Sequence, residues 1–129
     1  RRCRVLVGAG SDVGGGTSLS MLRTLGDGYK ALKMKGQRLT PFAALYLATL
    51  GAAKSLYLDG CIGNFSKGKE ADFIVVDPSC SESVARRWRA SADIAGKLFS
   101  AFMLADCRIV AESRLLGKVA ASSGGSHRQ

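Results

Sequence analysis

The first apolar run of the chain leads directly into a glycine-rich stretch. Residues 4–9, Arg-Val-Leu-Val-Gly-Ala, are typical of a short parallel strand that is buried on both faces. Gly10, Ser11 and Asp12 mark the C-terminal end of this expected strand. The three glycines at 14–16 predict a loop whose backbone takes positive φ or approaches another group closely.

A helix is predicted after this loop. Residues 19–35 carry an imperfect apolar stripe, and Thr17 or Ser18 can cap the free N–H groups at its start. Gly26 and Gly28 lie inside the stripe. Because a glycine within a helix costs about 1 kcal/mol relative to alanine, we expect a kink or local fraying there.

Thr40 and Pro41 predict the start of a second helix over residues 41–50. Threonine caps the free N–H groups, and proline at the first helical position has no N–H to leave unsatisfied. A further short helical turn is expected at residues 52–56.

The pattern changes in the second half of the chain. Residues 71–77 are β-branched and bounded by turn residues, which predicts a strand, and residues 93–105 form an apolar helix. Residues 109–111 and 115–119 predict two strands or a hairpin, followed by a Ser/Gly-rich tail from residue 122. The order of elements indicates the end of one α/β unit joined to part of a β-rich layer.

The amino-acid composition is that of a globular protein. The 129 residues are 47% hydrophobic and 22% charged, which suffices for one core. No uncharged apolar stretch reaches the ~18 residues that span a bilayer, and no leader peptide is recognised, so we expect a soluble cytoplasmic protein. The chain starts with Arg1 and runs at once into apolar residues, which predicts a piece of a longer protein.

The formal charge of +9 raises the question of nucleic-acid binding. Basic residues are scattered along the chain, and the one dense patch, residues 86–89, lies in the polar segment 78–92 that opens with Pro78. No zinc-finger or RNP-like pattern accompanies it. We interpret the patch as a solvated helix face and expect no nucleic-acid partner.

Cysteine and histidine are too sparse for a metal cluster. The four cysteines are separated by long unequal intervals with no CxxC pair, which favours reduced and partly buried thiols; they are Cys3, Cys61, Cys80 and Cys107. His127 is the only histidine and lies in the Ser/Gly-rich tail. We interpret it as a residue of a disordered tail and not as a ligand.

Asp12 is the main candidate for chemistry. A carboxylate at the C-terminal end of a buried parallel strand, before a flexible glycine loop, lies where α/β folds place catalytic groups. Position alone favours the alternative, a turn or helix-cap aspartate. Phosphate binding is disfavoured, because no Gly-Lys-Ser/Thr follows the loop and Val13 stands where a dinucleotide-binding fingerprint has its third glycine.

The segment around Asp12 resembles a known family. Residues 10–22 read G-S-D-V-G-G-G-T-S-L-S-M-L, similar to the barrel-end segment of guanine deaminases in the amidohydrolase superfamily. The resemblance runs from about residue 7 to residue 119, with further matches at 36–39, 47–51 and 62–73. The Ala-Thr-Leu-Gly and Gly-Lys-Glu-Ala-Asp runs are common to many amidohydrolases, whereas Asp-Val-Gly-Gly-Gly-Thr-Ser points to guanine.

This resemblance implies an α/β fold: the C-terminal end of a metal-dependent (β/α)₈ barrel plus part of a small β-sandwich domain. Residues 1–58 would form the last strand and helices of the barrel. Residues 59–121 would form the C-terminal portion of the sandwich with an intervening helix, and residues 122–129 a disordered tail.

The resemblance also implies a chemistry and a cofactor. Asp12 matches the family's aspartate at the end of the eighth strand, which contacts both a single zinc ion and the substrate. It takes a proton from water as hydroxide attacks the ring carbon bearing the amino group, and helps pass protons to departing ammonia. Zinc can lower the pKa of water to about 7. The expected reaction converts guanine to xanthine and ammonia, in a homodimer.

Other residues of the family's site have no counterpart here. The His-x-His pair, two later metal histidines and the catalytic glutamate are absent from these 129 residues. One carboxylate cannot complete a zinc site of three or more protein ligands, so we expect the isolated chain to be inactive and to retain no zinc. The sequence also departs from the family at Ser11, at Gly26 and Gly28, and at residues 56–58.

Two alternatives remain open. The first is another amidohydrolase acting on a heteroaromatic amine or halide. The second is a non-enzymatic basic binding module that uses the glycine loop only as a turn. A separate class of zinc deaminases is set aside, because its H-x-E and P-C-x-x-C signature is absent.

Overall fold

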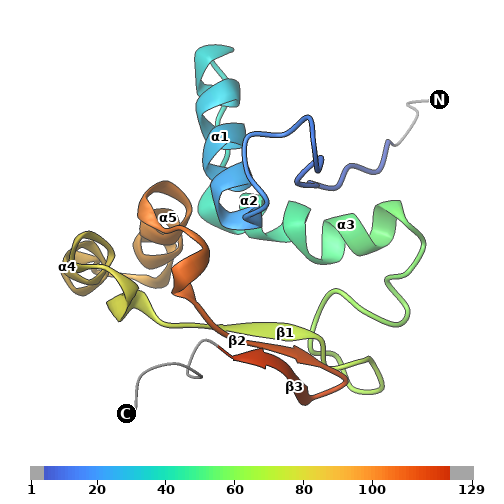
Figure 1. The fold of residues 1–129 in the computed structure, drawn as a ribbon. Coiled ribbons are helices and arrows are strands. Elements are labelled where there is room, and N and C mark those ends of the chain that lie inside the picture. Colours follow the sequence, from blue (N-terminus) through green and yellow to red (C-terminus); the bar gives the residue numbers. More distant parts are fainter. Residues whose placement is uncertain (1–4, 123–129) are drawn as a thin grey trace, which may run out of the picture.

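The computed structural model describes residues 5–122 as a group of helices beside a small sheet (Figure 1). The helices are α1 (Met21–Met34), α2 (Pro41–Ala48), α3 (Leu50–Ser55), α4 (Glu82–Ala90) and α5 (Ile94–Leu104). The strands are β1 (Phe73–Val76), β2 (Val110–Leu115) and β3 (Lys118–Ser122), and short 3-10 turns occur at η1 (Pro78–Cys80) and η2 (Cys107–Ile109).

The sheet is antiparallel throughout, in the order β1-β2-β3. Phe73 pairs with Arg114 and Ile74 with Ser113, and the β2–β3 hairpin turns at Leu116-Gly117. The sequence predicted both the strand near residues 71–77 and the hairpin. β1 is apolar yet partly exposed, and all of β3 is exposed, so the sheet buries little surface among the described residues.

The parallel strand predicted at residues 4–9 is wrong for the described part of that segment. Residues 5–10 have no regular secondary structure, and Val5 and Val7 are 77% and 58% exposed. A parallel strand needs a neighbour that accepts and donates along its whole length. Here the segment makes one backbone bond to the body, from Ala9 N–H to the Leu47 carbonyl at 2.8 Å.

Helix starts follow local capping rules. Thr40 accepts a hydrogen bond from Ala43 N–H, as the Thr-Pro pair predicted, and α2 begins at Pro41. The α1 helix begins later than expected, with Ser20 at its N-cap position instead of Thr17 or Ser18. The short helix expected at 52–56 is present as α3.

The α1 helix is unbroken through Gly26 and Gly28, so the predicted kink or fraying is wrong. Packing supplies the reason for Gly26, which is buried: a Cβ there would overlap the carbonyl oxygen of Phe102 in α5. The glycine lets the two helices approach closely, and the contacts between them offset its low helix propensity.

The basic patch lies on an exposed helix, as predicted. Arg86, Arg87 and Arg89 are exposed on α4, while Val84 is buried and Trp88 packs against it. Ser81 caps this helix by accepting from Val84 N–H.

Helix α5 links two apolar clusters that form the core. One contains Val84, Ala101, Ala105 and Ile109, and the other contains Leu25, Ala44 and Phe102. Leu22 of α1 packs against both clusters. The first of these clusters joins α5 to α4 and the second joins it to α1 and α2, so α5 holds the helical part together.

Some sequence predictions concern residues at or beyond the ends of the described range. Ser122, the first residue of the predicted tail, ends β3, whereas His127 and Cys3 lie outside the described residues.

The other cysteines are free thiols; Cys80 is partly buried, while Cys61 and Cys107 are exposed. No helix within residues 5–122 is long and apolar enough to cross a bilayer. The boundaries at 58 and 121 stay predictions.

Candidate active site

Asp12 lies in a tight turn formed by residues 11–17, here called the Asp12 turn. Its backbone has φ 51°, in the left-handed region that asparagine and aspartate tolerate better than most residues. The N–H groups of Gly15 and Gly16 both donate to the Asp12 carbonyl oxygen, at 3.0 and 2.6 Å. The chain therefore folds back on Asp12 before entering α1.

This turn requires glycine at positions 14 and 16, and Gly15 leaves room for the Asp12 side chain. Gly14 has φ 97°, which side chains rarely adopt. A Cβ on Gly15 would lie 2.8 Å from Asp12 Oδ2, and one on Gly16 would overlap the carbonyl oxygen of Ser11. The predicted positive φ and close approach are both confirmed, because the glycines leave room for the Asp12 carboxylate and its neighbouring backbone.

The Asp12 carboxylate is used differently from the aspartates that cap helical turns. Asp77, Asp93 and Asp106 each accept a hydrogen bond from a backbone N–H at the start of a helical turn, at 2.8–2.9 Å. Within residues 5–122, the exposed Asp12 side chain has no such partner. Among the described residues, Asp12 shapes the turn through its backbone carbonyl and not through its carboxylate.

The chain just before the Asp12 turn and the end of the turn itself each contact a helix. Gly8 fits closely against α3, where a Cβ would lie 2.6 Å from Ala52 Cα. On the other side, Thr17 Oγ1 donates to Asp27 Oδ2 in α1 at 2.6 Å. Sequence patterns did not indicate this second contact, because the two residues are ten positions apart and Thr17 was expected only as a helix cap.

The described residues do not by themselves fit a zinc ion. Residues 5–122 contain no group of three or more His, Cys, Asp or Glu side chains that could hold a metal. Asp12 could supply one ligand, and a protein zinc site needs at least three. The structure thus brings no second predicted site residue to Asp12.

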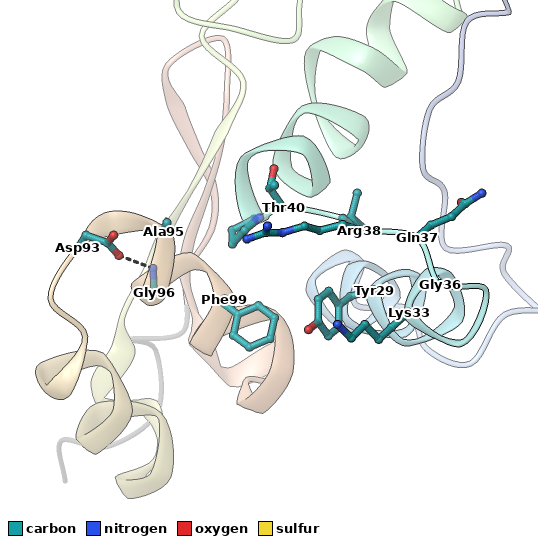
Figure 2. Close-up of a pocket in the computed structure, with 12 residues that line it drawn as sticks. Tyr29, Lys33, Gly36, Gln37, Arg38, Thr40, Asp93, Ala95, Gly96 and Phe99 are labelled. Carbon is teal, nitrogen blue, oxygen red and sulfur yellow. Dashed lines mark hydrogen bonds between the residues drawn. The ribbon is translucent and has the colours of Figure 1, made fainter.

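A separate cavity of about 630 Å³ lies between α1, α5 and the loop that joins α1 to α2 (Figure 2). Lys33 and Arg38 contribute positive charge to its lining. The rings of Tyr29 and Phe99 meet edge to face, with their centroids 5.0 Å apart. Asp93 supplies a carboxylate, which already caps α5 through Gly96 N–H. Asp12 does not line this cavity, and no sequence motif indicated it.

The chain is similar in sequence to known guanine deaminases. The chain is 45% identical to guanine deaminase of Escherichia coli over 116 residues, 90% of this chain and 26% of the relative. It is 41% identical to human guanine deaminase over 85 residues, 61% of this chain and 19% of the relative. The chain therefore spans about a quarter or less of the length of these relatives.

Solved structures agree with the sequence comparison. The E. coli guanine deaminase structure matches with a TM-score of 0.88 and 44% identity, over 91% of this chain and 27% of that one. The Bradyrhizobium japonicum guanine deaminase structure matches with a TM-score of 0.80 and 30% identity, over 92% and 32%. The amidohydrolase family profile matches residues 2–109, and the chain belongs to the amidohydrolase family.

Proposed function

We propose that this chain is the C-terminal part of a guanine deaminase, an enzyme that hydrolyses guanine to xanthine and ammonia. The observation that carries the proposal is the Asp12 carboxylate, which has no hydrogen-bond partner within residues 5–122 and lies in a turn that needs glycine at positions 14 and 16. The 45% identity to E. coli guanine deaminase over 90% of the chain supports the choice of substrate.

Asp12 acts in this proposal as a base and a proton carrier. Its carboxylate is exposed and has no hydrogen-bond partner within residues 5–122, so it can take a proton from the attacking water molecule. The water oxygen bonds to the guanine carbon that bears the amino group, and the proton held on Asp12 passes to that amino group as the C–N bond breaks. Asp12 thereby contacts the substrate as well as the water.

A zinc ion would make the water more acidic, and Asp12 would be one of its ligands. The remaining ligands would have to come from outside residues 5–122, which hold no cluster of three ligating side chains. The (β/α)₈ barrel, the composite β-sandwich and the homodimer belong to the same proposal for the whole protein.

The first experiment separates catalysis by Asp12 from a structural role in the turn. Asp12→Asn keeps the size of the side chain and suits a left-handed turn, but removes the base. In the whole protein that carries this chain, we expect ammonia release from guanine to fall by about 10²-fold or more, with little change in thermal midpoint.

Glu70→Gln is the matched control, because Glu70 is also an exposed acid in a loop and the substitution removes the same charge. It should leave turnover unchanged. A folded Asp12→Asn protein with parental turnover would contradict the assignment of Asp12. If the parental protein releases ammonia from another aminated heteroaromatic ring but not from guanine, the proposal that guanine is the substrate is contradicted.

A further inference from the structure

The contact between Thr17 and Asp27 joins the Asp12 turn to α1. The Thr17 hydroxyl donates to Asp27 Oδ2 at 2.6 Å, within the 2.5–2.7 Å range typical of hydroxyl–carboxylate hydrogen bonds. The same bond is the largest cause that lowers the pKa of Asp27 from its ordinary value, followed by the bond from Lys30. Asp27 is therefore ionised at neutral pH and remains a strong acceptor.

Asp27 is itself held on a well-packed part of α1. Its other oxygen, Oδ1, accepts from Lys30 Nζ at 3.1 Å one turn further along the helix. Its neighbours in sequence, Leu25 and Gly26, are both buried, and Leu25 shares an apolar cluster with Phe102 of α5. The acceptor is thus fixed by the helical core.

The Asp12 turn has little else to hold it. Residues 12–17 are all exposed, and three of them are glycines, which lose much backbone entropy when ordered. The Gly15 and Gly16 bonds to the Asp12 carbonyl lie within the turn. Among the described residues, Thr17 provides the side-chain hydrogen bond from this turn to another element.

We propose that Thr17 and Asp27 are positioning residues: their hydrogen bond keeps the Asp12 turn closed and so holds the Asp12 carboxylate in place. The catalytic consequence rests on the proposed function of Asp12, but the structural consequence does not. Small displacements of a reacting group lower turnover steeply, so a bond remote from the substrate can affect the rate.

Amide hydrogen exchange of Gly15 and Gly16 in the whole protein tests the structural step. Thr17→Val keeps the shape of the side chain and removes the hydroxyl. We expect exchange at both glycines to quicken roughly three- to tenfold, the scale of one lost hydrogen bond. Thr17→Ser retains the hydroxyl and should restore parental exchange.

Asp27→Ala should have the same effect as Thr17→Val, and the double variant should add little to either, because both changes remove the same bond. Thr49→Val is the matched control: it also removes one hydroxyl bond, from Thr49 Oγ1 to the Leu45 carbonyl, but at the end of α2. It should leave Gly15 and Gly16 unchanged. Exchange at buried Leu25 reports whether α1 itself stays folded.

Kinetics then test the positioning role. We expect kcat for guanine to fall by roughly tenfold in Thr17→Val, with little change in KM, and to recover in Thr17→Ser. Unchanged exchange at Gly15 and Gly16 in Thr17→Val would overturn the proposal. So would faster exchange with parental kcat, in a protein whose Asp12→Asn variant is inactive.

Two further outcomes are also decisive. If the parental protein does not act on guanine, the proposed function fails, and the exchange measurements still decide whether the Thr17–Asp27 bond holds the turn. If Thr17→Val also loses protection at Leu25, exchange is measured in Asp27→Ala instead, because this variant leaves the turn sequence intact. Faster exchange at Gly15 and Gly16 in Asp27→Ala supports the proposal, and unchanged exchange overturns it.

Discussion

Several aspartate side chains among the described residues are already committed to partners within the chain. Asp77, Asp93 and Asp106 satisfy N–H groups that helical turns leave unpaired at their starts. Asp27 instead accepts from Thr17 and Lys30, and links a loop to a helix. A carboxylate that is committed to backbone or cation partners is a poor candidate for a base, and Asp12 differs from all four in having no such partner among the described residues.

Asp106 offers a residue-scale prediction about pH. Its pKa is lowered to about 2, first by the side-chain hydrogen bonds of Arg108 and then by the Arg108 backbone N–H. A lowered folded-state pKa means that the stabilisation is fully present above the unfolded pKa, 3.8, and is lost as the pH falls through about 2. In Arg108→Ala we expect the Asp106 pKa to rise but stay below 3.8, because the backbone donor remains.

Carboxyl chemical shifts measured by NMR between about pH 1 and pH 5 would follow this titration directly. The sharpest comparison is between the parental protein and Arg108→Ala. An Asp106 carboxyl group that titrates at its ordinary pKa in the parental protein would show that the Arg108 contact does not persist in solution.

At the scale of elements, α1 matters because it follows the Asp12 turn in the chain and carries Asp27, the acceptor of the Thr17 hydroxyl. Its position is set by three contacts with its neighbours: Leu25 packs with Ala44 of α2, Tyr29 with Phe99 of α5, and Gly26 lies against the Phe102 backbone. Any change that pushes α1 away from α5 should therefore also move Asp27 relative to Thr17.

The two glycines of α1 give an internally matched test of this packing. Gly28 has open space around its Cβ position, so Gly28→Ala should stabilise the protein by about 1 kcal/mol through helix propensity. Gly26→Ala gains the same propensity but forces a methyl group into the Phe102 carbonyl oxygen, and should destabilise by about 1–3 kcal/mol. Urea unfolding of both variants measures the difference, and equal midpoints would rule out close α1–α5 packing.

At the scale of the whole molecule, the described residues expose many large apolar side chains. Among them are Val5 at 77%, Tyr57 at 86% and Phe65 at 79% exposed. Such surface is typical of faces that another part of a protein covers.

The isolated 129-residue chain should therefore associate with itself. We expect sedimentation velocity to show concentration-dependent oligomers, because apolar surface is buried when copies meet. Val5→Lys with Val7→Lys should weaken the association, whereas Asn64→Lys with Ser66→Lys adds the same charge at exposed polar positions and should weaken it less. A monomer with a sharp cooperative melt would contradict this expectation.

Local sequence signals determined the elements whose causes are themselves local. The Thr40-Pro41 pair set the start of α2, the apolar residues near 93–105 predicted α5, and the β-branched segments predicted β1 and the hairpin. The glycines at 14–16 predicted a turn with positive φ and close approach around Asp12. Capping, helix propensity and backbone sterics act over a few residues, so they can be recognised without the fold.

Only the tertiary structure decided the features that depend on distant partners. Residues 5–9 have the composition of a buried strand but form none, because no neighbouring strand pairs with them in the described chain. Gly26 is accommodated because α5 crosses α1 at that point, and Thr17 reaches Asp27 because α1 is held there. These outcomes rest on contacts between segments far apart in sequence, whose geometry is fixed when apolar surfaces pack together and not by the order of residues around each site.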